Sequence, residues 1–168
     1  MIELQTWLHS IHEGDKLAFE MLYENMHHPL FTIIYRITQD KALSEDILQD
    51  LFLKLYLSPP KVSTNSRAYL CQMARNLAID SMRKNKPKVD LELAEKTIIQ
   101  ADDLSQAIDL EDAIQSLSER ECQIFTMHID AGLKFQEIAF ILNTPLGTVF
   151  WVYQKAIMKL RNYLGDIR

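Results

Sequence analysis

Residues 135–164 read FQEIAFILNTPLGTVFWVYQKAIMKLRNYL, and their pattern is that of two helices joined by a short turn. Apolar residues recur at helical spacing in 135–142 and again in 148–164, while the segment 143–147 between them holds a proline and a glycine. A short amphipathic helix, a tight turn and a longer amphipathic helix make a helix-turn-helix unit. The pattern alone is moderately specific, because many helix pairs share it.

The segment before this unit also predicts helices. Ser118 is followed three residues later by Glu121, which is the spacing of a capping box, and the helix that it opens is expected to stop at Gly132. A short helix is expected over Leu110 to Leu117. The last third of the chain therefore reads as a small helical domain.

The N-terminal part predicts four helices. The second is expected to begin after Asp15 and to be kinked or restarted at Pro29. The third is expected to open at Asp40 or Ser44. The positions that form the apolar stripes are Leu4, Trp7, Leu8 and Ile11 in the first helix, Leu17, Phe19, Leu22 and Tyr23 in the second, Ile47, Leu48, Leu51, Phe52 and Leu55 in the third, and Leu70, Met73, Ala74, Leu77 and Met82 in the fourth, over about 67–84.

Composition supports an all-α chain and excludes several classes of protein. The chain has 168 residues, 48% of them hydrophobic, and only four glycines, too few for the tight turns of a β-rich fold or for a phosphate-binding loop. The two cysteines have no metal-ligand spacing, and no nucleophile–base motif is present, so we expect no metal, no cofactor and no enzyme activity. No apolar run is long enough for a membrane span, and a cytoplasmic location is expected.

The charge is distributed unevenly along the chain. The net charge is −5, yet residues 1–86 hold ten basic and ten acidic residues, and residues 113–168 hold six basic and five acidic ones. Residues 87–112 therefore carry the whole acidic excess. We expect two small helical domains, 1–86 and 113–168, joined by an acidic linker over 87–112.

Four motifs, in order and in register, resemble bacterial extracytoplasmic-function (ECF) sigma factors. They are GDKLAFEMLY at 14–23, SEDILQDLFLKLY at 44–56, RAYL at 67–70 with ARNLAID at 74–80 and the basic pair at 83–84, and LSERE at 117–121 with EIA at 137–139 and GTV at 147–149. The resemblance covers nearly the whole chain. It implies a transcription initiation factor that binds core RNA polymerase and promoter DNA.

The resemblance assigns roles to residues of the N-terminal domain. It implies docking on the clamp helices of the polymerase β′ subunit. It also implies opening of the −10 promoter element, a step that needs a pocket for an unstacked base and cations beside the phosphates. The residues that match the docking helix are Asp46, Gln49, Asp50 and Phe52; those expected to contact −10 DNA are Lys61, Asn65, Arg67, Tyr69, Arg75, Asn76 and Arg83. The acidic linker would enter the polymerase's basic channel, although a solvated connector has the same composition.

The last helix departs from the family pattern. Helical spacing places Val149, Tyr153, Ala156 and Leu160 in the core, so that two aromatic residues and a valine fall where the family is often basic. Lys155, Lys159 and Arg161 are the remaining phosphate partners. The residues expected to contact DNA or a partner are Thr148, Phe150, Trp151, Val152, Gln154 and Lys155. Apolar groups can read thymine methyls, and an exposed aromatic patch also suits a protein interface.

Two further interpretations follow from that departure. In one, the chain is a sigma-like regulatory protein whose C-terminal domain binds an anti-sigma factor, another partner or a second copy of itself instead of −35 DNA. In the other, it is a helix-turn-helix repressor, which leaves the docking helix unexplained. The sigma-factor interpretation, with the polymerase β flap as a second contact, accounts for more of the chain.

Overall fold

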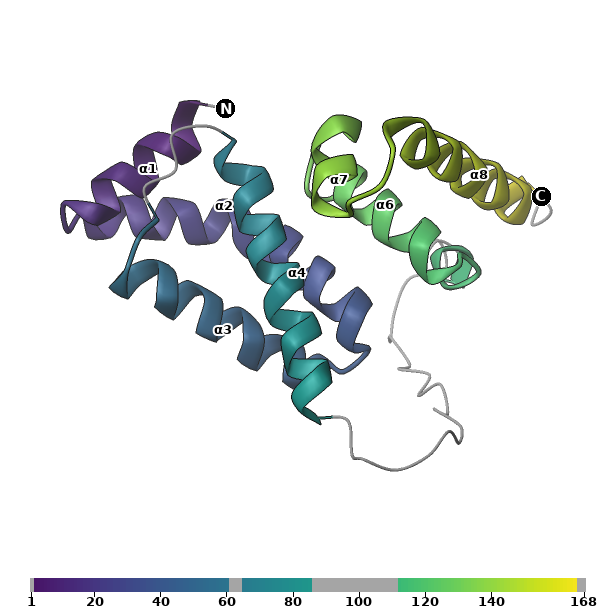
Figure 1. Ribbon diagram of the computed structural model, residues 1–168. Coiled ribbons are helices and arrows are strands. Elements are labelled where there is room, and N and C mark those ends of the chain that lie inside the picture. The colour runs from purple at the N-terminus through teal and green to yellow at the C-terminus, as the bar shows by residue number, and fades with distance from the viewer. Residues whose placement is uncertain (1, 61–64, 86–111, 166–168) are drawn as a thin grey trace.

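The computed structural model describes residues 2–60, 65–85 and 112–165, and every regular element within those ranges is a helix (Figure 1). This confirms the predicted all-α fold. The helices are α1 (Ile2–His12), α2 (Lys16–Thr38), α3 (Lys41–Leu57), α4 (Ser66–Asn85), α6 (Glu119–Ile129), α7 (Phe135–Ile141) and α8 (Leu146–Gly165), and residues 112–115 are also helical.

Side-chain caps fix where the helices begin. The Asp15 carboxylate accepts hydrogen bonds from the N–H groups of Leu17 and Ala18, at 2.9 and 3.3 Å, which satisfies donors that the first turn of α2 leaves open. At α6 the capping box is present, since the Ser118 N–H donates to Glu121 Oε2 at 2.8 Å and Ser118 Oγ accepts from the Glu121 N–H at 3.4 Å. Both predicted caps are confirmed.

Asp40 opens α3, which settles one alternative that the sequence left open. Its carboxylate accepts from the N–H of Leu43 at 3.0 Å. Ser44 lies one turn inside the helix, where it is buried, and its hydroxyl is 2.7 Å from that of Thr38. The hydroxyl pair therefore joins the end of α2 to the start of α3.

Pro29 does not restart the second helix. α2 runs without interruption from Lys16 to Thr38, with Pro29 inside it and buried. A proline in a helix interior removes one backbone hydrogen bond. Leu22, Met26 and Leu30 are fully buried on the same side of α2, so tertiary packing compensates for the local cost.

The inner face of α8 differs from the prediction by one position. Val149, Val152, Ala156 and Leu160 are buried, whereas Tyr153 is half-buried. The ring of Tyr153 instead lies at the edge of the core, 4.9 Å from the ring of His128 and 5.0 Å from that of Phe135. Val152 is therefore a core residue, and its predicted place on the recognition surface is wrong.

The described residues form two helical halves that pack against one another. In the N-terminal half, residues 2–85, α2 packs against α1, α3 and α4; in the C-terminal half, residues 112–165, α8 packs against α6 and α7 (Figure 1). The halves meet where α2 packs against α6 and α4 against α7. We call this contact the seam. The predicted acidic linker lies almost entirely outside the described residues.

Candidate polymerase and nucleic-acid interfaces

The first candidate surface is one face of α3. Asp46, Gln49 and Asp50 are exposed, and because α-helical positions three and four apart share a face, they form one polar row. Leu53 and Leu57 continue this row toward the end of the helix and are 55% and 72% exposed. These five residues form the candidate docking face, which is called the docking face of α3 below. The two leucines were missed in the sequence, although their spacing of three and seven residues from Asp50 could have revealed them.

Phe52 does not belong to the docking face, which corrects the prediction. It is 4% exposed, and its ring lies 4.7 Å from the ring of Tyr23 and 6.2 Å from that of Phe19. Edge-to-face and tilted aromatic contacts of this kind stabilise a core. Phe52 therefore anchors α3 to α2 and presents no surface to a partner.

The second candidate surface is the outer face of α4. Tyr69, Asn76 and Arg83 follow one another at seven-residue intervals and are exposed, so they form a row along the helix. Asn65 is exposed immediately before α4, in the left-handed backbone region with φ 57°. The row offers an aromatic ring, an amide and a guanidinium, which suit base stacking, a base edge and a phosphate. Lys61 lies outside the described residues.

Arg67 and Arg75 do not share that outer face. Both are half-buried at the seam. One Arg67 nitrogen, Nη1, donates to the carbonyl oxygen of Ala131 at 3.2 Å, and the other, Nη2, donates to Asn25 Oδ1 at 3.2 Å. The structure thus separates the predicted −10 residues into an exposed row and a pair held between the halves.

The third candidate surface is the N-terminal part of α8. Thr148, Phe150, Trp151 and Gln154 are exposed, with Phe150 at 50% and Trp151 at 62%. The Phe150 ring packs edge-on against Phe135 of α7 at 5.7 Å, which fixes its position. The predicted set is thus brought together on one side of the helix, except for the buried Val152.

Two lysines of α8 surround a buried carboxylate. Glu121 is 3% exposed, and its oxygens lie 2.7 Å from Lys159 Nζ and 3.6 Å from Lys155 Nζ. Burial favours the neutral acid, but hydrogen bonds from Lys159 and from the backbone and hydroxyl of Ser118 outweigh it, and the pKa of Glu121 falls to about 2. Lys159, whose side chain is 40% exposed, is therefore engaged in an ion pair with Glu121.

Lys155 has a second contact besides Glu121. Its Nζ lies 5.3 Å from the centre of the Trp151 ring, a cation–π arrangement that covers one face of the indole. The lysine side chain is 47% exposed. Lys155 thus links the aromatic surface of α8 to the buried carboxylate at the start of α6.

The part of the chain that the structure describes contains no group of three or more His, Cys, Asp or Glu side chains able to hold a metal ion. No helix within those ranges has the length and apolar character required to cross a membrane.

Two family models match this chain and together cover most of it. Residues 22–88 match sigma-70 region 2, and residues 107–161 match sigma-70, region 4. The first match contains the docking face of α3 and the outer face of α4, and the second contains α6, α7 and the exposed side of α8.

Curated relatives match over most of their length. The chain is 28% identical to the ECF RNA polymerase sigma factor SigW of Bacillus subtilis, over 94% of each chain. It is 24% identical to the RNA polymerase sigma-H factor of Pseudomonas aeruginosa, over 86% of this chain and 85% of the relative. It is 23% identical to the ECF RNA polymerase sigma factor SigK of Mycobacterium ulcerans, over 96% and 94%.

Solved structures share the fold. CnrH in complex with the cytosolic domain of CnrY superposes with a TM-score of 0.66 at 15% identity, over 98% of each chain. The sigma factor RpoE in complex with the anti-sigma factor NepR from Bartonella quintana gives a TM-score of 0.59 at 21% identity, over 83% of this chain and 91% of that one.

Proposed function

This chain belongs to the ECF group of the sigma-70 family, and from that premise we propose that the docking face of α3 binds core RNA polymerase and that α4 opens the −10 promoter element. The chain is a transcription initiation factor that directs core polymerase to promoters. This function includes no chemical step by the chain itself. Bacterial transcription takes place in the cytoplasm, which is where we expect the chain to act.

The observation that carries the docking proposal is the composition of the α3 face. Asp46, Gln49 and Asp50 offer two carboxylates and an amide, while Leu53 and Leu57 add an exposed apolar end. A partner that fits this face presents basic groups beside an apolar patch. The family resemblance implies that this partner is the β′ clamp helices of the polymerase, and carboxylates on an exposed row would steer and orient a basic partner.

For promoter opening, the outer face of α4 supplies the groups that the step requires. Tyr69 can stack on an unpaired base, Asn76 can bond to a base edge, and Arg83 can neutralise a phosphate. Asn65 stands at the start of this row. We propose that Arg67 and Arg75 join these contacts in the promoter complex.

For the C-terminal half, we propose contacts with the −35 element and with the polymerase β flap. Phe150 and Trp151 present apolar surface suited to thymine methyl groups, and Thr148 and Gln154 add hydrogen-bonding groups. Two structures with this fold were solved as complexes, one of them with an anti-sigma factor by name. An anti-sigma factor is accordingly a proposed partner of this chain.

Charge reversal at α3 tests the docking proposal. Asp50→Arg is expected to weaken binding to purified core polymerase at least about tenfold, because a cation would face the basic partner. Glu20→Arg is the control, since it makes the same charge change at an exposed position on α2, outside the docking face. Equal effects of the two substitutions in a fluorescence binding titration would contradict this assignment.

A further inference from the structure

Phe150 and Trp151 of α8 are exposed aromatic residues whose rings the fold holds in place. Phe150 is 50% exposed, and its ring packs edge-on against the Phe135 ring, with 5.7 Å between the ring centres. Trp151 is 62% exposed, and Lys155 Nζ lies 5.3 Å from the centre of its ring. Since each ring is already positioned, binding a partner through its exposed surface costs little side-chain entropy.

The support behind Phe150 comes from the core of the C-terminal half. The Phe135 ring stacks on His128 of α6, with 4.3 Å between the ring centres, and lies 5.0 Å from the ring of Tyr153 of α8. His128 Nδ1 in turn donates to the carbonyl oxygen of Leu133 at 2.8 Å, which fixes the imidazole. Phe135 is therefore held between α6 and α8 and gives Phe150 a rigid base.

Gln154 lies on the same side of α8 as the two rings, one turn further along. It is exposed, and it follows Trp151 by three positions and Phe150 by four. One turn before the rings, Gly147 adds no side chain to this side, and a Cβ added there would meet nothing within 4 Å. The fold therefore leaves open space beside the rings. We call Phe150, Trp151 and Gln154 the reading surface of α8.

Cations are scarce along this part of α8. Residues 146–160 contain no arginine, and their two cations are Lys155 and Lys159. Both lysines approach the buried Glu121 carboxylate, with distances from Nζ to oxygen of 3.6 and 2.7 Å. An arginine or lysine on guanine is the commonest specific contact in the major groove. The reading surface supplies no such group, so guanine is not the base that its chemistry selects.

The chemistry of the reading surface matches an A·T pair. In the major groove thymine carries an exposed methyl group, and apolar side chains contact that methyl group. Adenine presents an acceptor and an amino donor side by side, and a glutamine amide bonds to both. Two aromatic rings with an amide one turn away therefore fit the major-groove edge of A·T pairs.

We propose that α8 selects A·T pairs in the −35 element: the rings of Phe150 and Trp151 contact thymine methyl groups, and Gln154 bonds to an adenine. The inference rests on the proposed −35 contact of the C-terminal half, and it adds which base pairs that contact selects and through which groups. Because contacts to methyl groups release no counterions, the preference for thymine should not depend on the salt concentration.

Replacement of thymine by uracil in the promoter tests the methyl contacts, because the two bases differ by the methyl group alone. The probe is a duplex promoter fragment identified from mapped transcripts, with deoxyuridine at one −35 thymine at a time, bound by the full chain assembled with core polymerase. We expect replacement of each contacted thymine to weaken binding about three- to fourfold, the effect of one buried methyl group. Uracil in the spacer between the −35 and −10 elements is the control and should leave binding unchanged.

Substitutions in the chain test which side chains read the bases. In the double variant Phe150→Ala with Trp151→Ala, the uracil effect should disappear, because the rings that contact the methyl groups are absent. Phe140→Ala is the matched control, since it removes an aromatic ring of α7 that is 76% exposed, and it should keep the uracil effect. 7-Deazaadenine, which lacks the N7 acceptor, should weaken binding of the unchanged chain but not of Gln154→Ala. Circular dichroism checks that each variant keeps its helices.

The uracil test on the unchanged chain needs no variant, so it decides the matter even where a variant does not fold. Promoter binding that no −35 uracil changes would overturn the proposal and leave the proposed function standing. So would −35 regions that share only G·C pairs, or a uracil effect that persists in the folded double variant. Loss of self-association or of partner-protein binding in that variant, with no uracil effect in the unchanged chain, would instead make this surface a protein interface. Failure of the assembled polymerase to bind any promoter would overturn the proposed function itself.

Discussion

Glu121 shows how one buried carboxylate organises the C-terminal half. It closes the capping box of α6 and accepts a hydrogen bond from Lys159 of α8, so it ties the two helices together. Because its pKa is lowered to about 2, the ionised form stabilises the fold. That contribution is fully present above the ordinary carboxylate pKa near 4.5 and is lost as the pH falls through about 2.

Glu121→Gln is therefore expected to lower the free energy of unfolding by about 2–3 kcal/mol at pH 7. The difference in free energy of unfolding between the variant and the unchanged chain should become smaller as the pH is lowered from about 5 toward 2. Urea unfolding at a series of pH values measures this difference. A difference in free energy of unfolding that stays constant down to pH 2 would contradict the assigned pKa. Glu119→Gln is the control, because Glu119 is an exposed neighbour in the same turn.

Phe52 and Leu53 are neighbours in sequence with opposite roles. Phe52 is 4% exposed and Leu53 is 55% exposed. Phe52→Ala is expected to cost about 3–5 kcal/mol of stability, because it empties an aromatic core site. Leu53→Ala should change stability by less than about 0.5 kcal/mol and weaken core polymerase binding. Thermal unfolding and a binding titration on both variants separate the two roles, and a reversed pattern would refute them.

At the scale of the element, α4 has an exposed outer face and a second face that packs at the seam. Arg83 lies on the outer face at the end of the helix, clear of the seam contacts that hold Arg67. Arg83→Ala is expected to weaken promoter binding to a similar degree across sequences and to reduce the salt dependence of binding by about one phosphate. Titrations at several salt concentrations test this, and an unchanged slope would remove Arg83 from the phosphate contacts.

Helical periodicity predicted the elements well where the apolar stripe was continuous. The spacing of Ile47, Leu48, Leu51, Phe52 and Leu55 placed Phe52 in the core, and the structure confirms it. Family resemblance assigned Phe52 to polymerase docking, and that assignment was wrong because the side chain is buried.

The inner face of α8 was less well predicted. Spacings of three and of four residues are both helical, so the pattern did not distinguish Val152 from Tyr153 as the core residue. The His128–Phe135 ring pair holds Tyr153 at the edge of the core.

The sequence could not predict which element covers Arg67 and Arg75. Family resemblance grouped both with the exposed row of α4, although the nine positions between Arg67 and Asn76 place these two on opposite sides of the helix. What covers the arginines is packing of α7 and the Ala131 carbonyl against α4, a contact between distant parts of the chain. Nothing in the local sequence of α4 encodes which element covers it.

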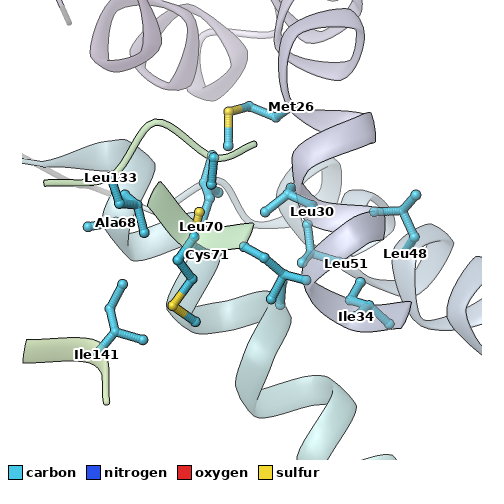
Figure 2. Packing of buried hydrophobic residues seen from close by; sticks show 14 of the residues in the cluster. Met26, Leu30, Ile34, Leu48, Leu51, Ala68, Leu70, Cys71, Leu133 and Ile141 are labelled. Atoms are coloured by element: carbon cyan, nitrogen blue, oxygen red, sulfur yellow. The ribbon is translucent and has the colours of Figure 1, made fainter. Parts of the chain in front are cut away.

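At the scale of the whole molecule, the surfaces proposed to bind polymerase and promoter DNA are distributed over the two halves. The N-terminal half carries the docking face of α3 and the outer face of α4, and the C-terminal half carries the exposed aromatic surface of α8. These three surfaces consist of exposed residues and are not part of the hydrophobic core, some of which Figure 2 shows, while Arg67 and Arg75 lie at the seam. Polymerase and DNA binding are therefore expected to be separable by mutation.

Run-off transcription with purified core RNA polymerase tests the central claim most directly. With templates identified by mapping transcripts after overexpression, the unchanged chain is predicted to give promoter-dependent transcripts. Asp50→Arg should abolish them through loss of polymerase binding, and Asn76→Ala should reduce them at the opening step with polymerase binding intact. Polymerase binding without any promoter-dependent transcript from the unchanged chain would contradict the account.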